Sequence, residues 1–142
     1  MSDQATTSVR VKHRFTTSPE RVFDAWLDPE KARRFLFASP TGQMVRAETD
    51  PRVGGRFTFT DRRAGEDVMH TGEYLEIERP RRLVFTFMVP KYSSVATQVT
   101  IEIVPLDSGC ELTLTHEGVP AEHADRGVKG WSGILDGLAA IG

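Results

Sequence analysis

The stretch that decides the fold is residues 123–141, HADRGVKGWSGILDGLAAI. Its large apolar residues follow one another at steps of three, three, one, three and three: Val128, Trp131, Ile134, Leu135, Leu138 and Ile141. This spacing is typical of an α-helix with one apolar face. Because nearly all of the preceding sequence has the pattern of strands, we expect that face to cover one side of a sheet.

Alternation of apolar and polar residues before this helix predicts strands with one face in water. We expect seven strands, over residues 9–16, 44–49, 56–60, 68–78, 83–89, 95–103 and 110–117. Loops are expected over residues 38–42 and 61–67, and turns over residues 50–55 and 79–81. A bulge is expected near Gly72. The connections are mostly short, which implies antiparallel neighbours.

Two short helices are predicted between the first and second strands. Ser18-Pro19-Glu20 combines a capping side chain, a proline suited to the first helical position and an acid at the positive end of the helix. Asp28-Pro29-Glu30 repeats the signal, so a second helix follows and ends near Phe35. The predicted fold class is therefore α+β, a curved antiparallel sheet of seven strands around a long C-terminal helix.

The 142 residues suit one domain; we expect residues 1–8 to be disordered and residues 9–142 to form it. A net charge of −2 gives no electrostatic reason to expect nucleic acid or an anionic membrane as a partner. Residues 1–8 lack the apolar stretch of a signal peptide, and no run approaches the ~20 apolar residues of a membrane helix. The single cysteine, Cys110, excludes an internal disulfide, so we expect a cytoplasmic protein with Cys110 in its core.

Short motifs along the chain occur in an order that resembles one superfamily. They are residues 18–26 (SPERVFDAW), 28–30 (DPE), 50–51 (DP), 53–57 (VGGRF), 72–77 (GEYLEI), Pro80, 82–85 (RLVF), 112–116 (LTLTH), and Gly130-Trp131 with Leu135 and Leu138. With this set, residues 9–141 resemble the SRPBCC or START-like superfamily, which has the helix-grip fold. Within it, the chain resembles the bacterial single-domain form of the heat-shock-protein-90 ATPase activator family.

The resemblance implies a sheet wrapped around the C-terminal helix, with a pocket for apolar ligands and a role in the stress response. The family is named after eukaryotic co-chaperones that carry an additional N-terminal domain, for which this chain has no room. We therefore expect a non-catalytic domain that binds a small apolar ligand. A module that binds a protein partner, such as a chaperone, is the alternative.

The candidate ligand-binding residues are those expected to face the space between sheet and helix. They are Phe35, Phe57, Phe59, Tyr74, Phe85, Phe87, His116, Trp131 and Leu135. Their aromatic surfaces would bury the ligand, while His116 and Tyr74 would orient it. The same aromatic residues are equally compatible with an ordinary core, because proteins pack their interiors densely.

His116 is the best polar candidate, because its parity with Leu112 and Leu114 points it inward. It would bond a ligand or act as an acid or base near neutral pH; the alternative is a structural histidine satisfied by the backbone or by Glu117. A hydrolase or cyclase that uses His116 is a further alternative, but no partnered nucleophile is readable, so we expect no catalytic residue. On the strand with Glu73 and Tyr74, we expect Glu73 in solvent and Tyr74 half-buried with its hydroxyl in water.

Metal sites and partner surfaces have weaker signals. The chain has four histidines: His13, His70, His116 and His123. Their spacing matches no known metal-binding pattern, so we expect no metal and no other cofactor. Three arginines at a predicted turn form either a solvated tip or a docking patch for an acidic partner: Arg79, Arg81 and Arg82. Exposed strand edges also lead us to consider a homodimer.

Overall fold

The computed structural model describes residues 6–36, 43–63, 65–90 and 96–141. In chain order they form β1 (Thr6–Phe15), α1 (Pro19–Leu27), α2 (Pro29–Phe35), β2 (Gln43–Thr49), β3 (Arg56–Arg63), β4 (Glu66–Glu78), β5 (Arg82–Phe87), β6 (Thr97–Leu106), β7 (Gly109–Pro120), a short 3₁₀ helix (Ala121–His123) and α3 (Ala124–Ile141). The loop predicted over residues 38–42 lies outside the described residues. β1 begins at Thr6, so the expectation that residues 6–8 are disordered is wrong.

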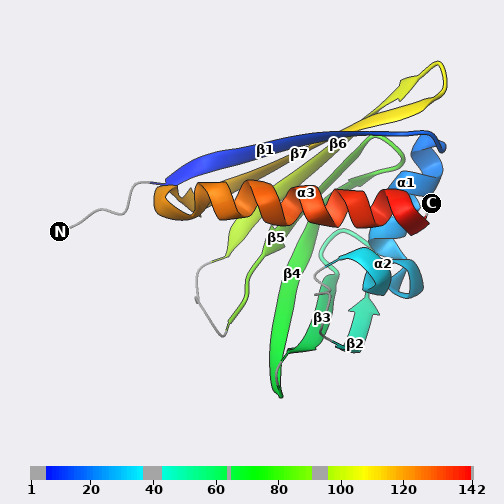
Figure 1. Ribbon diagram of the computed structural model, residues 1–142. Helices are drawn as coiled ribbons and strands as arrows, with labels where there is room; N and C mark the ends of the chain where they lie inside the picture. The colour runs from blue at the N-terminus through cyan, green and yellow to red at the C-terminus, as the bar shows by residue number, and fades with distance from the viewer. Residues whose placement is uncertain (1–5, 37–42, 64, 91–95, 142) are drawn as a thin grey trace.

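The strands form one antiparallel sheet in the order β1-β7-β6-β5-β4-β3-β2. α3 runs alongside β1 on one side of this curved sheet, and α1 and α2 lie at the C-terminal end of α3 (Figure 1). The arrangement is the predicted α+β helix-grip fold. It brings the end of the first strand, both short helices and the last turns of α3 to the same corner of the molecule.

The predicted apolar face of α3 is largely the face that packs inward. Trp131, Leu135 and Leu138 are buried. The spacing predicts Val128 on the same face, but 40% of its surface is exposed. Neither α3 nor any other helix in the described ranges has the length and hydrophobicity to span a membrane.

Two glycines allow α3 to approach its neighbours closely. A Cβ atom added to Gly127 would lie 3.2 Å from a methyl group of Val9 on β1. One added to Gly137 would lie 3.3 Å from Cβ of Phe35 on α2. The start of α3 therefore packs closely on β1, and the end of α3 packs closely on α2.

The two short helices begin as their capping signals predict. Oγ of Ser18 accepts a hydrogen bond of 3.2 Å from the amide of Arg21 in α1. Oδ1 of Asp28 accepts one of 3.0 Å from the amide of Glu30 in α2. Asp28 also ends α1, since its own amide donates to the carbonyl of Asp24. One residue thus sets the angle between the helices.

The hairpin of β3 and β4 is longer than predicted. The loop expected over residues 61–67 is wrong, because β3 continues to Arg63 and β4 already begins at Glu66. Asp61 and Val68 stand opposite each other in the ladder and are both buried. The polar composition of this stretch concealed a strand pair, since Asp61 occupies an interior position that sequence patterns assign to apolar residues.

The irregularity in β4 lies beyond Gly72. Pairing with β5 shifts register between Tyr74 and Glu76, so the bulge expected near Gly72 is displaced along the strand. Gly72 itself permits a close approach. A Cβ atom there would collide with the carbonyl oxygen of Thr86 and lie 2.7 Å from the ring of Phe57.

Candidate functional site

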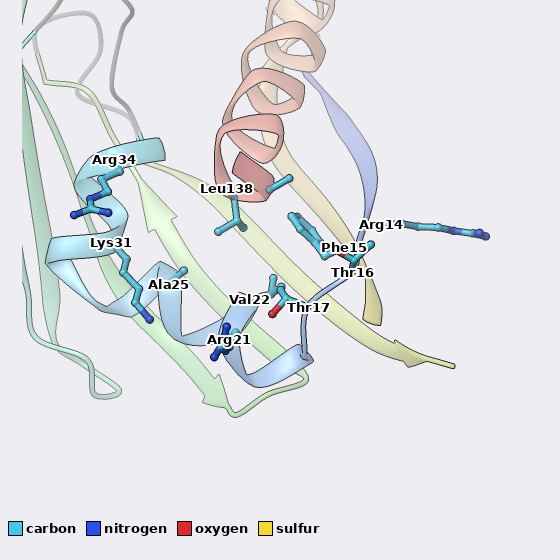
Figure 2. Close-up of a pocket in the computed structure, with 11 residues that line it drawn as sticks. Arg14, Phe15, Thr16, Thr17, Arg21, Val22, Ala25, Lys31, Arg34 and Leu138 are labelled. Carbon is cyan, nitrogen blue, oxygen red and sulfur yellow. The ribbon is translucent and has the colours of Figure 1, made fainter. Parts of the chain in front are cut away.

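A cavity lies where β1, α1, α2 and the end of α3 meet. Its volume is about 490 Å³. Figure 2 shows residues from all four elements around this space, with Leu138 on the last turns of α3 facing Phe15 at the end of β1. The volume falls in the range typical of small-molecule sites.

The floor of the cavity is apolar. It is formed by Phe15, Val22, Ala25 and Leu138, all of which are at least 96% buried. Phe15 follows from the alternation of β1, while Val22 and Ala25 lie three residues apart on the inner face of α1. These residues belong to the hydrophobic core, so the cavity is an open edge of that core.

The rim is basic. Among the lining residues that the structure describes, none is acidic and four carry a positive charge: Arg14, Arg21, Lys31 and Arg34. Arg14 is different from the others, because its guanidinium pairs with Glu111 at 3.3 Å and points away from the rest (Figure 2). Within the described ranges, Arg21, Lys31 and Arg34 take part in no ion pair.

One of the two acids on α1, Asp24, is already engaged elsewhere. Both carboxylate oxygens of Asp24 accept hydrogen bonds from Arg79, at 2.8 and 2.9 Å. These bonds hold the pKa of Asp24 below its ordinary value, and the charges of Arg79 and Lys31 act in the same direction. Asp24 is therefore an anion whose hydrogen bonds go to the turn after β4, while Lys31 interacts with it through charge alone.

A second polar arrangement lies inside the sheet, centred on His116. The indole N–H of Trp131 donates to Nδ1 of His116 at 3.1 Å. Nε2 of His116 lies 2.6 Å from Oγ1 of Thr97, and that hydroxyl donates to the carbonyl of Phe87 at 3.1 Å. Because Nδ1 accepts, the neutral ring carries its proton on Nε2 and donates to Thr97. Each polar group in this series of hydrogen bonds, from Trp131 to the carbonyl of Phe87, therefore has a partner.

Burial determines the charge of His116. The residue is 8% exposed, and burial lowers its pKa to about 4. The imidazole is therefore neutral at neutral pH, with both ring nitrogens engaged inside the protein. This favours the structural alternative for His116 over acid–base chemistry, with Trp131 and Thr97 as its partners in place of Glu117.

Three of the sequence-predicted site residues meet around this histidine. The ring of Phe87 contacts those of His116 and Trp131, at centroid distances of 5.6 and 6.0 Å. His70 stacks on the same phenylalanine at 6.1 Å. The structure thus brings Phe87, His116 and Trp131 together, while their role in binding a ligand stays a prediction.

The other predicted residues pack as core. Phe57, Phe59, Tyr74 and Phe85 surround a void of only about 10 Å³, which is close to the room one water molecule needs. Phe35 packs edge-on against Trp26, and Leu135 is fully buried. Their function in binding is likewise still a prediction.

Tyr74 is more deeply buried than its sequence environment indicates. The prediction of a half-buried ring with a solvated hydroxyl is wrong, since the residue is 2% exposed. Burial raises the pKa of its hydroxyl well above the ordinary value, and the charge of Asp50 adds to the effect. Glu73 is partly exposed, as expected.

The residues of the 490 Å³ cavity were not among the sequence candidates. Arg21 belongs to α1, and Lys31 and Arg34 to α2, where charged residues are ordinary on the solvent side of a short helix. Their proximity to Leu138 depends on how the ends of β1 and α3 meet, which no local pattern encodes. The feature of the sequence that could have indicated this site is the presence of cationic residues on two short helices that also have an apolar face and directly follow a strand.

Metal ligation has no support from the geometry of the described residues. None of their His, Cys, Asp and Glu side chains gather in groups of three or more that could hold a metal ion. His13 bonds Asp136 at 3.2 Å, and His123 lies 3.9 Å from Glu122 near the start of α3. Cys110 is buried, as its parity predicts.

Most of the chain matches one known protein family. The family model described as Activator of Hsp90 ATPase homolog 1-like protein matches residues 16–142. The chain belongs to this family. The family that the sequence motifs indicate is therefore confirmed, and the match includes α1, α2 and α3 as well as His116 and Trp131.

Solved structures share this fold over almost their whole length. Protein CV1439 from Chromobacterium violaceum is 27% identical, with a TM-score of 0.86 and coverage of 94% of this chain and 95% of that chain. The AHSA1-like protein from Aeromonas hydrophila is 23% identical, with a TM-score of 0.79 and coverage of 94% and 90%. Protein NE0264 from Nitrosomonas europaea is 22% identical, with a TM-score of 0.80 and coverage of 94% and 92%. A comparison with curated proteins gave no match.

Proposed function

We propose that this member of the family is a non-catalytic domain that binds a small molecule in the cavity between β1, α1, α2 and the end of α3. The observation that carries the proposal is the cavity itself, with about 490 Å³ of space over an apolar floor. Phe15, Val22 and Leu138 would bury the apolar part of the ligand, at roughly 25 cal/mol per Å² before ordering costs.

The non-catalytic part of the proposal is supported by His116. Its ring nitrogens are bonded to Trp131 and Thr97, so the residue is occupied by the fold. A hydrolase or cyclase that uses His116 would have to break one of these bonds first. The cytoplasmic location expected from Cys110 and the role in the stress response stay predictions.

The cavity can be tested by filling it from its edge. Ala139 lines the cavity and is exposed, so Ala139→Trp adds bulk without disturbing the core. Ala140 is also exposed but does not line the cavity, so Ala140→Trp is the matched control. With the neutral apolar dye Nile red, we expect fluorescence enhancement by the native protein and by Ala140→Trp, and its loss in Ala139→Trp. Equal enhancement in both variants, or none in the native protein, would contradict the proposal.

The alternative from the sequence, a chaperone-associated interaction module, stays a prediction. Arg79 is paired with Asp24, Arg81 with Glu78, and Arg82 with Glu76 and Glu102, so an acidic partner would have to displace these carboxylates. Capture from a bacterial lysate with the three arginine charges reversed tests it, because unchanged partners would exclude this surface. A homodimer through the outermost strands β1 and β2 is tested by sedimentation.

A further inference from the structure

We infer that the ligand of this cavity is a small amphipathic anion, a molecule with one acidic head group on an apolar body. The inference rests on the proposed function and names the class of ligand. The head would lie against Arg21 and Lys31, and the body against Val22 and Leu138. No neutral apolar molecule would use the charged half of this site.

The charge of the rim is a local property. The chain carries a net charge of −2, yet the described residues that line the cavity include basic side chains and no acidic one. Arg14 is neutralised by Glu111, which leaves Arg21, Lys31 and Arg34 without an ion pair in the described ranges. Cations that border an apolar surface and lack an internal counter-ion attract an anion that can reach both.

Helix geometry sets these cations above the floor. Arg21 and Ala25 are four residues apart on α1, so they share one face of that helix. Lys31 and Arg34 are three residues apart and share a face of α2. In Figure 2, the side chain of Lys31 extends from α2 toward α1 near Ala25 and Arg21, while the guanidinium of Arg34 points away from Leu138. Two helices thus supply charge to one edge of an apolar hollow.

The acids near this edge do not fill the role of the ligand. Asp24 is held by two hydrogen bonds from Arg79. Glu20 is exposed, and its charge raises the pKa of Arg79 and of Cys110. A negative charge from outside the protein would therefore meet Arg21 and Lys31 without competition from a bonded carboxylate.

The test compares three probes with the same ten-carbon chain, each below its micelle concentration: decanoate, decyl phosphate and decanol. By isothermal titration calorimetry, we expect both anions to bind about tenfold more tightly than decanol. The reason is that a charged head group makes two charge-assisted contacts, with Arg21 and Lys31, that the hydroxyl of decanol cannot make. The ratio of the affinities for decanoate and decyl phosphate shows whether the site prefers a carboxylate or a phosphate head group. The preference should shrink as salt is raised.

Paired variants locate the preference. Arg21→Gln with Lys31→Gln should lower decanoate affinity to that of decanol and leave decanol unchanged. The control, Arg126→Gln with Lys129→Gln, removes the same charge from exposed positions near the start of α3. It should leave all three affinities unchanged. Circular dichroism checks folding, and the salt dependence of the native protein decides the matter if the double variant unfolds.

The outcomes separate the two claims. Equal binding of decanol and decanoate overturns the inference and leaves the proposed function standing. Binding of none of the probes overturns the proposed function. A preference for anions that survives in the Arg21 and Lys31 variant, or that is also lost in the control, overturns the assignment of the head group. Binding to phosphatidylglycerol vesicles without binding to free decanoate identifies a membrane surface as the partner and overturns the small-molecule inference.

Discussion

The indole nitrogen of Trp131 lies 3.1 Å from Nδ1 of His116, joining the centre of α3 to the seventh strand. Trp131 is 5% exposed and His116 8%, so neither group can exchange this bond for one with water. The bond fixes the tautomer of the histidine and, through Thr97, the end of β5. It is a buried polar contact that links the helix to the sheet.

The two tryptophans give a direct measure of this bond. Trp131→Phe removes the donor and leaves Nδ1 of His116 buried without a partner. Trp26 is equally buried, but its indole nitrogen has no hydrogen-bond partner among the described residues. By urea denaturation, we expect Trp131→Phe to lose about 1–2 kcal/mol more unfolding free energy than Trp26→Phe. Equal losses would show that the bond adds nothing to stability.

The stability should depend on pH through His116. Its pKa is about 4 in the folded protein, against an ordinary value of 6.5. Between these values the unfolded state binds more protons, so the unfolding free energy falls as the pH is lowered from about 6.5 to 4. Over this whole pH range, the loss of unfolding free energy that is due to His116 is about 3 kcal/mol.

His116→Gln isolates that contribution. The pKa of Asp24 is lowered as well, so its contribution to stability also falls as the pH falls. The effect of His116 is therefore obtained by subtracting the pH dependence of His116→Gln from that of the native protein. Urea denaturation at several pH values from 7 to 4 should show a shallower slope for His116→Gln than for the native protein. Parallel curves would mean that His116 titrates alike in both states, contrary to the burial seen here.

Gly72 should not tolerate a side chain. Gly72→Ala places a methyl group against the carbonyl of Thr86 and the ring of Phe57, so we expect a loss of about 3 kcal/mol in unfolding free energy. Gly130 on α3 has open space around it, and Gly130→Ala should add up to about 1 kcal/mol through helix propensity. Thermal denaturation of both variants checks the prediction, and a neutral Gly72→Ala would contradict the close approach of β4 and β5.

Cys110 should be unreactive in the folded protein. It is fully buried, and this burial raises the pKa of its thiol, so little thiolate forms and reagents cannot reach it. We expect no reaction with a thiol-specific reagent until urea unfolds the chain, and complete reaction afterwards. Rapid modification without denaturant would show that the start of β7 opens readily.

Local patterns predicted most of the fold because each has a direct physical cause. The spacing of Trp131, Leu135 and Leu138 defines the buried face of α3, and Ser18 and Asp28 start α1 and α2 through their side chains. The pattern failed where a buried residue is polar. Asp61 made residues 61–67 resemble a loop, although they extend two paired strands.

The site was harder to predict, because it depends on contacts between distant segments. Parity placed His116 inward, yet its partners Thr97 and Trp131 follow from strand register and from the rotation of α3. The cavity joins Phe15 to Leu138, which lie near opposite ends of the chain. Such a juxtaposition follows only from the assembled fold.

The central claim is that ligands bind at the junction of β1, α1, α2 and α3. NMR spectroscopy of the protein labelled with ¹³C in its methyl groups and ¹⁵N in its amides, titrated with decanoate, tests it most directly. The account predicts shifts of the Val22 and Leu138 methyl signals and the Phe15 amide, with the Trp131 indole signal unmoved. Shifts centred on Trp131 and on the amides of Phe87 and His116 would contradict it and place the ligand in the interior site that the sequence suggested.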